Sequence, residues 1–235
     1  MLNFLHACGA DKYASDTYTT RDGSAVKLMF FGHASISLEV GNKYIYVDPV
    51  EMYADYSKLP KADVILITHS HPDHLDAKAI EQLSKNTTSI LCDSISNEKI
   101  HKGHIVKPGD NLTLLHNIPL EVISAYNITP GHLQFHPKEN KNCGYLMTIG
   151  GSRIYIAGDS ENTTEMKALK NIDIAFLPVN QPYTMTVDEA IDAIKAIRPK
   201  IFYPYHYGET NVKTDIKRLS KEAGTYSEVR IRPLE

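Results

Sequence analysis

The sequence has few cysteines and no excess of basic residues. Its 235 residues include three cysteines, Cys8, Cys92 and Cys143, which lie far apart and form no CxxC pair. This spacing favours neither a disulfide framework nor a zinc site built from thiolates. Lys and Arg total 25 against 28 for Asp and Glu, which gives a net charge of −3. Proteins that wrap a nucleic-acid backbone usually present a basic face, so we expect no nucleic-acid partner.

Long hydrophobic runs are also missing. No apolar stretch approaches the roughly 18 to 20 residues that span a bilayer, so we expect no integral membrane segment. Residues Met1–Cys8 have no basic n-region and only a short apolar run, which argues against a signal peptide. We therefore expect a cytoplasmic protein. Leu5–Cys8 distantly resembles a lipoprotein cleavage site, and this leaves the cell envelope open as an alternative.

Short apolar runs separated by turn residues dominate the chain from Val26 onward. They predict strands over 26–31, 35–40, 44–47 and 64–67, then a helix over 76–83 with Asp76 as its N-cap. We find no linker or low-complexity tract that would separate domains. The prediction is an N-terminal extension over residues 1–25, followed by one domain over 26–235.

The second half of the chain repeats this plan. Apolar runs at 146–149, 153–156, 173–178 and 201–203, with a helical pattern over 187–197, follow the order of the first half. In this comparison Asp159 corresponds to Asp48, and Asp173 to Asp63. Two strand-rich halves must bury their sheets against each other and cover them with helices, so we predict a four-layer α/β/β/α sandwich. Loops at the strand ends of both halves can then meet at one cleft.

Four metal-binding side chains lie within six residues, between a buried strand and a helix. They are His69, His71, Asp73 and His74. Alternate residues of an extended chain point the same way, so His69 and His71 can face one ion. Imidazole suits zinc, iron, copper or nickel, and a carboxylate tolerates harder ions. The run predicts a site for two adjacent ions.

This run resembles the signature of the metallo-β-lactamase-fold hydrolases. Four other blocks match that family in its order: Phe31–Ser35, Val47–Pro49, Ala157–Asp159 and Tyr203–His206. The likeness is closest to metal-dependent hydrolases related to the ascorbate-6-phosphate lactonases. The resemblance implies a four-layer sandwich and metal-dependent hydrolysis.

The resemblance also implies a ligand set. His69 and His71 would hold the first metal with a third histidine, Asp73 and His74 would hold the second with His206, and Asp159 would bridge the two ions. Both His132 and His136 fit as the third histidine of the first metal, and we choose His136. The complete expected set is His69, His71, His136, Asp73, His74, Asp159 and His206.

Other residues near these blocks receive supporting roles. Asp48 is expected to accept the distal N–H of a ligating histidine. His33 is expected either to reach the cleft or to cap a turn. The expected substrate contacts are Lys138, Gln181 and Tyr183. Asp73 and His206 are the expected catalytic residues, since they can orient the attacking water or assist the charged intermediate.

The expected reaction is hydrolysis by a metal-activated water. The resemblance implies two divalent ions, with zinc first and manganese, iron or nickel as alternatives. The substrate would be an ester-like, lactone or phosphate-bearing small molecule. Two alternatives remain: a phosphodiesterase of the phospholipase D-like branch, and a metal-binding module without turnover. The sequence also leaves a homo-oligomer open.

Overall fold

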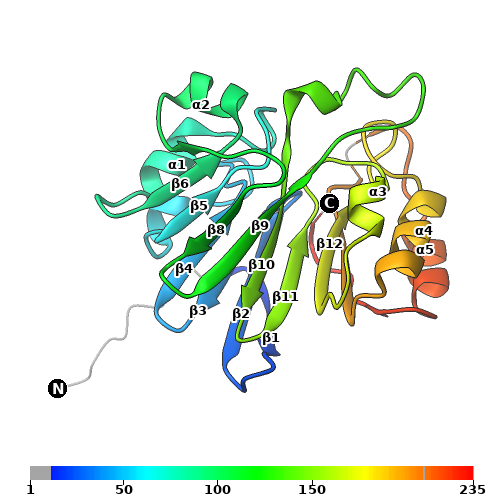
Figure 1. Cartoon of the computed structure of the whole chain (residues 1–235), viewed down its shortest axis with the longest axis horizontal. Coiled ribbons are helices and arrows are strands. Elements are labelled where there is room, and N and C mark those ends of the chain that lie inside the picture. Colours follow the sequence, from blue (N-terminus) through cyan, green and yellow to red (C-terminus); the bar gives the residue numbers. More distant parts are fainter. Residues whose placement is uncertain (1–11, 209, 235) are drawn as a thin grey trace.

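The strands form two sheets that face each other (Figure 1). The computed structural model describes residues 12–208 and 210–234, so the segment Met1–Cys8 lies outside the described residues. The first sheet contains, in spatial order, β1 (Ala14–Thr19), β2 (Ala25–Gly32), β3 (Ser35–Val40), β4 (Lys43–Val47), β5 (Val64–Leu66), β6 (Ser89–Cys92) and β7 (His104–Ile105). The second contains β14 (Glu228–Val229), β13 (Ile201–Tyr205), β12 (Ile174–Pro178), β11 (Ser152–Ile156), β10 (Cys143–Ile149), β9 (Ile118–Ser124) and β8 (Asn111–Leu114).

Helices cover the outer face of each sheet. The α-helices are α1 (Ala77–Leu83), α2 (Ser94–Ile100), α3 (Thr164–Lys167), α4 (Val187–Ile197) and α5 (Ile216–Ala223), with short 3₁₀ turns at Tyr56–Lys58 and Lys138–Asn140. In Figure 1, α1 and α2 lie beside β5 and β6, while α3, α4 and α5 lie on the far side of β12. The predicted four-layer α/β/β/α sandwich is confirmed. None of the described helices has the length and apolar character needed to cross a bilayer.

The alternation of side chains along each strand creates three apolar cores. In β2, Leu28 and Phe30 point into the core between the sheets, whereas Met29 and Phe31 point outward to the core under α1. Phe30 packs against Tyr203 of the second sheet with ring centroids 5.2 Å apart. The third core lies between the second sheet and its helices. Burial on both faces explains why these strands read as almost continuous apolar runs.

The two sheets are built on one plan, which supports the predicted duplication. In each, four antiparallel strands (β1–β4 and β8–β11) are followed by parallel strands (β5–β7 and β12–β14). Asp63 accepts the backbone N–H of Tyr44 at 3.0 Å, and Asp173 accepts that of Arg153 at 2.8 Å. Each aspartate therefore ties the start of one parallel strand to its neighbour.

The register corrects one detail of the expected repeat. The backbone N–H of Asp48 donates to Leu66, and the N–H of Ala157 makes the equivalent bond to Phe176. Ala157, and not Asp159, thus occupies the position of Asp48. Asp48 and Asp159 correspond in the sequence pattern, but in the fold Asp159 lies two residues beyond the equivalent of Asp48.

Part of the expected N-terminal extension belongs to the first sheet. Residues Ala14–Thr19 form β1, which pairs with β2 in an antiparallel register. Alternate β1 residues are exposed, as at a sheet edge, and this weak apolar content explains why the sequence pattern did not predict a strand. The predicted helices over 76–83 and 187–197 are confirmed as α1 and α4. Asp76 caps α1 by accepting the N–H of Lys78 at 2.9 Å.

Asp173→Asn should destabilise the fold in a pH-dependent way. Burial opposes ionisation of Asp173, but Lys200, the Arg153 N–H and Arg21 together lower the pKa of its carboxyl. Stability from a lowered pKa is present above the unfolded value of about 3.9 and is lost as pH falls through the folded value. The loss should be about 1–3 kcal/mol at pH 7 and smaller at low pH.

Urea unfolding of the wild type and the variant at neutral and acidic pH tests this expectation. Glu98→Gln, an exposed carboxylate on α2, is the matched control and should change little. Equal stability of Asp173→Asn and the wild type at pH 7 would contradict the role of Asp173 in the fold.

Candidate metal centre

The predicted site residues meet at one end of the sandwich, where strands of both sheets end. His33 follows β2, the His69–His74 segment follows β5, Asp159 follows β11 and His206 follows β13. His33 and His206 have φ values of 51°, in the left-handed region that residues other than glycine rarely adopt. Such strained backbone concentrates at functional sites, where the surrounding structure holds it.

Two clusters of possible ligand atoms form at this end. The first consists of His69, His71, His136 and Asp159, and the second of His33, Asp73, His74 and His206. Within each cluster, one nitrogen or oxygen atom from every member lies within 4.8 Å of the others. The seven expected ligands are thus brought together, and His33 joins them.

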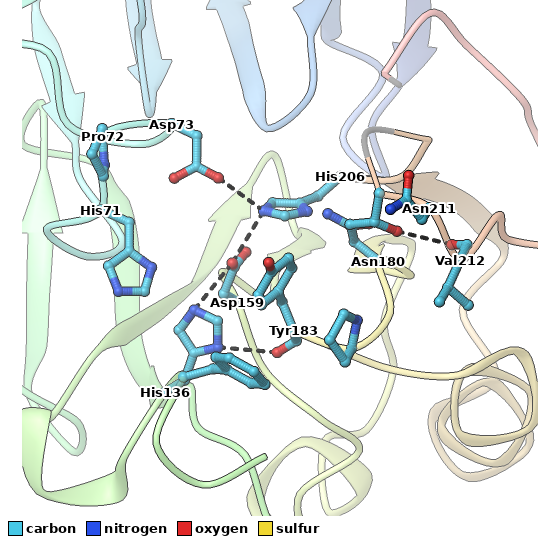
Figure 2. A pocket seen from close by; sticks show the side chains of 13 residues that line it. His71, Pro72, Asp73, His136, Asp159, Asn180, Tyr183, His206, Asn211 and Val212 are labelled. Carbon is cyan, nitrogen blue, oxygen red and sulfur yellow. Dashed lines mark hydrogen bonds and ion pairs between the residues drawn. The ribbon is translucent and has the colours of Figure 1, made fainter. Parts of the chain in front are cut away.

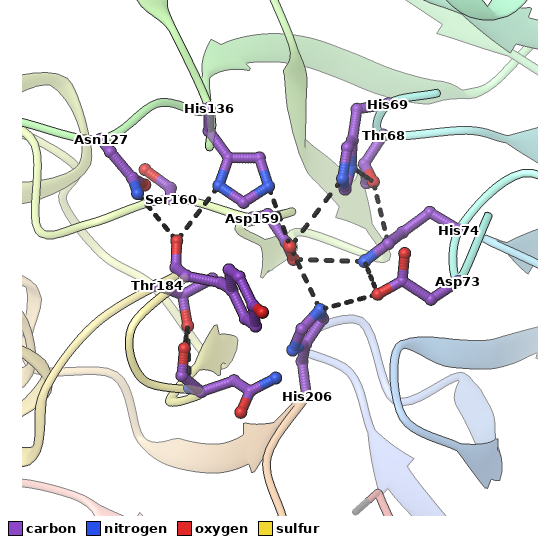
Figure 3. A network of polar contacts seen from close by, with 12 residues as sticks. Thr68, His69, Asp73, His74, Asn127, His136, Asp159, Ser160, Thr184 and His206 are labelled. Atoms are coloured by element: carbon purple, nitrogen blue, oxygen red, sulfur yellow. Dashed lines mark hydrogen bonds and ion pairs between the residues drawn. The ribbon is translucent and has the colours of Figure 1, made fainter. Parts of the chain in front are cut away.

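Asp159 connects the two clusters (Figure 3). Its Oδ2 lies 3.2 Å from His136 Nε2 in the first cluster and 3.1 Å from His206 Nε2 in the second. Its Oδ1 lies 3.3 Å from His74 Nε2. A carboxylate in this position can place one oxygen toward each of two ions, as expected for a bridging ligand.

The second cluster is arranged around Asp73. Its Oδ2 lies 3.1 Å from His33 Nε2, 3.4 Å from His206 Nε2 and 3.8 Å from His74 Nε2. The Asp73 side chain is 36% exposed, whereas that of Asp159 is 3% exposed. Asp73 is therefore the carboxylate of the site that can reach a molecule entering from solvent.

Several buried atoms of the site lack hydrogen bonds of acceptable geometry within the described residues. They are the Nε2 atoms of His69, His74, His136 and His206, together with Asp159 Oδ1. Native proteins rarely leave so many buried polar atoms unsatisfied. Their convergence fits metal coordination.

The opposite ring nitrogens of three histidines are held by the protein. His74 Nδ1 lies 2.8 Å from Asp48 Oδ2, and His136 Nδ1 lies 3.1 Å from the carbonyl oxygen of Tyr183. His69 Nδ1 lies 3.0 Å from Thr68 Oγ1, which donates to Asp48 Oδ2 at 2.6 Å. With the proton on Nδ1, each Nε2 keeps a lone pair for a metal. Asp48 has the position expected of it, and it reaches His69 through Thr68.

The electrostatics of the site favour a bound cation. Burial works against ionisation of Asp159, but His206 and His74 outweigh it and hold the pKa of its carboxyl well below the usual range. Burial and the neighbouring His74 lower the pKa of His69 and favour its neutral, metal-binding form. For His74, burial opposes protonation, but Asp159 and Asp48 raise its pKa well above the usual value.

The structure separates His136 from His132. His132 Nδ1 lies 3.2 Å from Oε1 of buried Glu161, so it is turned toward that carboxylate and belongs to neither cluster. Glu161 also accepts the backbone N–H groups of Ile128 and Thr129 at 2.6 and 2.7 Å. Glu161, which lies two residues after Asp159, therefore anchors the loop that carries His136.

The three expected substrate contacts have different surroundings. Tyr183 lines the pocket in front of the clusters, a cavity of about 620 Å³ (Figure 2). Lys138 instead binds Glu165 and the Tyr126 hydroxyl, each at 3.0 Å, and lines a separate cavity. The Gln181 amide donates to the Thr184 carbonyl. Among the described residues, neither Lys138 nor Gln181 lines the main pocket, and substrate contact by either stays a prediction.

The role of His33 was underestimated from the sequence. A lone histidine in a Gly-His-Ala turn fits either a cap or a cleft residue, and the pattern offers no signal to choose between them. The structure places its ring 3.7 Å from that of His206, and the backbone N–H of His206 donates to the His33 carbonyl. A contact between the two sheets, which the sequence pattern does not reveal, therefore identifies His33 as a site residue.

Comparisons with known proteins show the family to which the chain belongs. The family model described as a beta-lactamase superfamily domain matches residues 27–206. The chain is 32% identical over 218 residues to the UPF0173 metal-dependent hydrolase Ta0764 of Thermoplasma acidophilum, with 85% of this chain and 92% of the relative covered.

Solved structures of similar proteins share the fold. A candidate metal-dependent hydrolase from Parabacteroides distasonis is 47% identical and superposes with a TM-score of 0.90, covering 95% of this chain and 100% of that one. A metallo hydrolase from Ignicoccus hospitalis, 24% identical, gives a TM-score of 0.75 over 89% of this chain and 96% of its own. The second likeness concerns the fold alone.

Thr68→Val should weaken metal binding without unfolding the protein. The change keeps the shape of the side chain but removes the hydroxyl that links His69 to Asp48. Loss of such a supporting contact typically lowers metal affinity by roughly 10–100-fold. Competition of Zn²⁺ between the protein and a chromophoric chelator measures this affinity. Thr20→Val removes a hydroxyl that donates to Asp22 at the opposite end of β2, and it serves as the control. Unchanged affinity in Thr68→Val would contradict the proposed link.

Proposed function

Because this chain belongs to the UPF0173 metal-dependent hydrolases of the metallo-β-lactamase superfamily, we propose that it hydrolyses a small molecule at a two-metal site. The proposed substrate class is an ester, a lactone or a phosphate-bearing compound, in line with the resemblance to the lactonase-like branch. The observation that carries the proposal is the pair of His/Asp clusters joined by Asp159 beside an open pocket. Two statements about partners stay predictions: the absence of a nucleic-acid partner and the formation of a homo-oligomer.

The proposed ligands of the two ions are the residues of the two clusters. Two divalent ions held there would lower the pKa of a water molecule between them and supply hydroxide at neutral pH. We propose zinc, because imidazole and carboxylate donors without a thiolate suit it, although manganese, iron and nickel accept the same donors.

Asp73 and His206 are the proposed catalytic residues. Asp73 Oδ2 is within hydrogen-bonding reach of His33 and close to His206 Nε2, and it is partly open to the pocket. Burial opposes ionisation of Asp73, but His206 and His33 lower the pKa of its carboxyl, so it stays an anion. It can therefore orient an attacking water and accept its proton. Burial lowers the pKa of His206, but Asp159 and Asp73 raise it, with a net rise to about 9. His206 lies beside Asp73 and can assist the charged intermediate.

Metal content is the first test. Elemental analysis of protein purified without added metal should find close to two ions per chain, as in other two-metal sites. His71→Ala removes one ligand of the first cluster and should lower that number. Absence of metal in the wild type, even after reconstitution with Zn²⁺ or Mn²⁺, would overturn the proposal.

Asp73→Asn separates an enzyme from a metal-binding module without turnover. The amide keeps the size of the side chain but cannot accept a proton, so hydrolysis should fall by roughly 10²–10⁴-fold while the fold persists. Asp22→Asn, an exposed aspartate in the turn between β1 and β2, is the control and should keep full activity. Equal kcat values for Asp73→Asn and the wild type would show that Asp73 is not the proton acceptor.

A further inference from the structure

The pocket in front of the clusters has a wall that differs chemically from its metal-binding floor. The wall comes from Asn180, Pro182 and Tyr183, from the segment 210–212 and from Phe135. From this wall we infer that the substrate is an uncharged carboxylic ester or lactone with an apolar substituent and an N–H or O–H group next to the scissile carbonyl. This inference rests on the proposed function and narrows its substrate class by excluding phosphate esters.

Lysine and arginine are missing from the described part of the pocket lining. The carboxylate and histidine side chains that line it are Asp73, Asp159, His71, His136 and His206. Proteins that recognise phosphate usually supply Arg or Lys for the anionic oxygens. Lys138, the lysine that the sequence offered for this purpose, is held by Glu165 and Tyr126 outside this pocket. The described wall therefore provides no counter-charge for a phosphate.

Helix N-termini are the other common phosphate sites, and the starts of α1, α4 and α5 are already capped by side chains. Asp76 accepts N–H groups at the start of α1, and Asp215 accepts one at the start of α5. At the start of α4, Thr186 and Glu189 form a reciprocal capping box. All three caps include a carboxylate, which disfavours a phosphate at these helix starts.

Apolar side chains stand open at the mouth of the pocket. Phe135 and Tyr183 pack edge to face with ring centroids 4.8 Å apart. Tyr183 is 40% exposed and Val212 is 57% exposed. Figure 2 shows Tyr183 and Val212 on the same side of the pocket as Asn180. Exposed apolar groups around a concave site mark a place where an apolar part of a ligand binds.

Asn180 adds a hydrogen-bond acceptor to this wall. It is 2% exposed, and its Oδ1 makes no hydrogen bond within the described residues. Its backbone N–H donates to Thr184 Oγ1 at 2.8 Å, and its carbonyl accepts the N–H of Thr184 at 2.9 Å, so the turn fixes its position. A buried acceptor is costly unless a ligand satisfies it. A substrate N–H or O–H does so, whereas an ionised phosphate has no proton to donate.

Two sets of chromogenic probes test the substrate class on the metal-loaded enzyme. The first set compares p-nitrophenyl butyrate with p-nitrophenyl phosphate and bis(p-nitrophenyl) phosphate. We expect kcat/KM for the ester to exceed that for either phosphate by at least about 100-fold. Val212→Lys adds a cation at an exposed position and should reduce this ratio, while Val212→Ala should raise KM for the butyrate ester more than for the acetate ester.

The second set, a pair of esters, tests the hydrogen-bond acceptor Asn180 Oδ1. p-Nitrophenyl N-acetylglycinate carries an N–H group next to the ester, and its N-methyl counterpart lacks it. The wild type should prefer the N–H compound by at least about 10-fold in kcat/KM, and Asn180→Leu should lose that preference. The wild-type comparison decides the question even if the variant does not fold.

The outcomes separate this inference from the proposed function. Faster turnover of either phosphate probe than of the ester would overturn the substrate class and leave the two-metal hydrolase standing. Equal kcat/KM values for the N–H and N-methyl esters would overturn the role of Asn180. No turnover of any probe by protein with two bound ions would overturn both the inference and the proposed function.

Discussion

The buried negative charge of Asp159 is the constraint on which the rest of the site depends. Its oxygens lie within 3.3 Å of Nε2 atoms of His74, His136 and His206, which come from both sheets and a connecting loop. An isolated carboxylate at this depth would be strongly disfavoured. The convergence of donor atoms from both halves compensates for that cost, and the same convergence provides two adjacent places for cations. The fold must therefore bring the two sheets together at this end to within the reach of one side chain.

The segments that supply the site also hold each other in place. Asp48 fixes His74 directly and His69 through Thr68, so one buried carboxylate orients histidines of both clusters. Two residues beyond Asp159, Glu161 binds the start of the loop that ends in His136. Each half thus uses one buried acidic side chain to anchor backbone or imidazole. Because these contacts lie behind the Nε2 atoms, they leave the pocket side open to substrate.

The sequence predicts those features that depend on short spacing and periodicity. Apolar runs predicted the four layers and both helices α1 and α4, and the spacing of His69, His71, Asp73 and His74 predicted their common location. Features that depend on side-chain direction were harder to predict. Lys138 lies two residues from His136 yet binds Glu165 on another surface, and His33 meets His206 only because the two sheets pack together. The sequence pattern did not predict the edge strand β1, because its residues alternate in exposure and few of them are apolar.

The internal duplication produces a symmetric frame that the site uses unequally. Asp63 and Asp173 do the same work in both halves, but Asp48 has Ala157 as its counterpart. The first half therefore uses the Asp48 carboxylate to orient histidines. In the second half the carboxylate lies two residues further along the chain, at Asp159, where it contacts both clusters. The second half also supplies the pocket wall, through the loop 180–183 and residues 210–212. Since these loops lie outside the repeated strands, their side chains can change while the Tyr183 carbonyl still holds His136. Substrate choice can then vary among proteins that keep this metal centre, which is why the wall, and not the clusters, carries the information about the substrate.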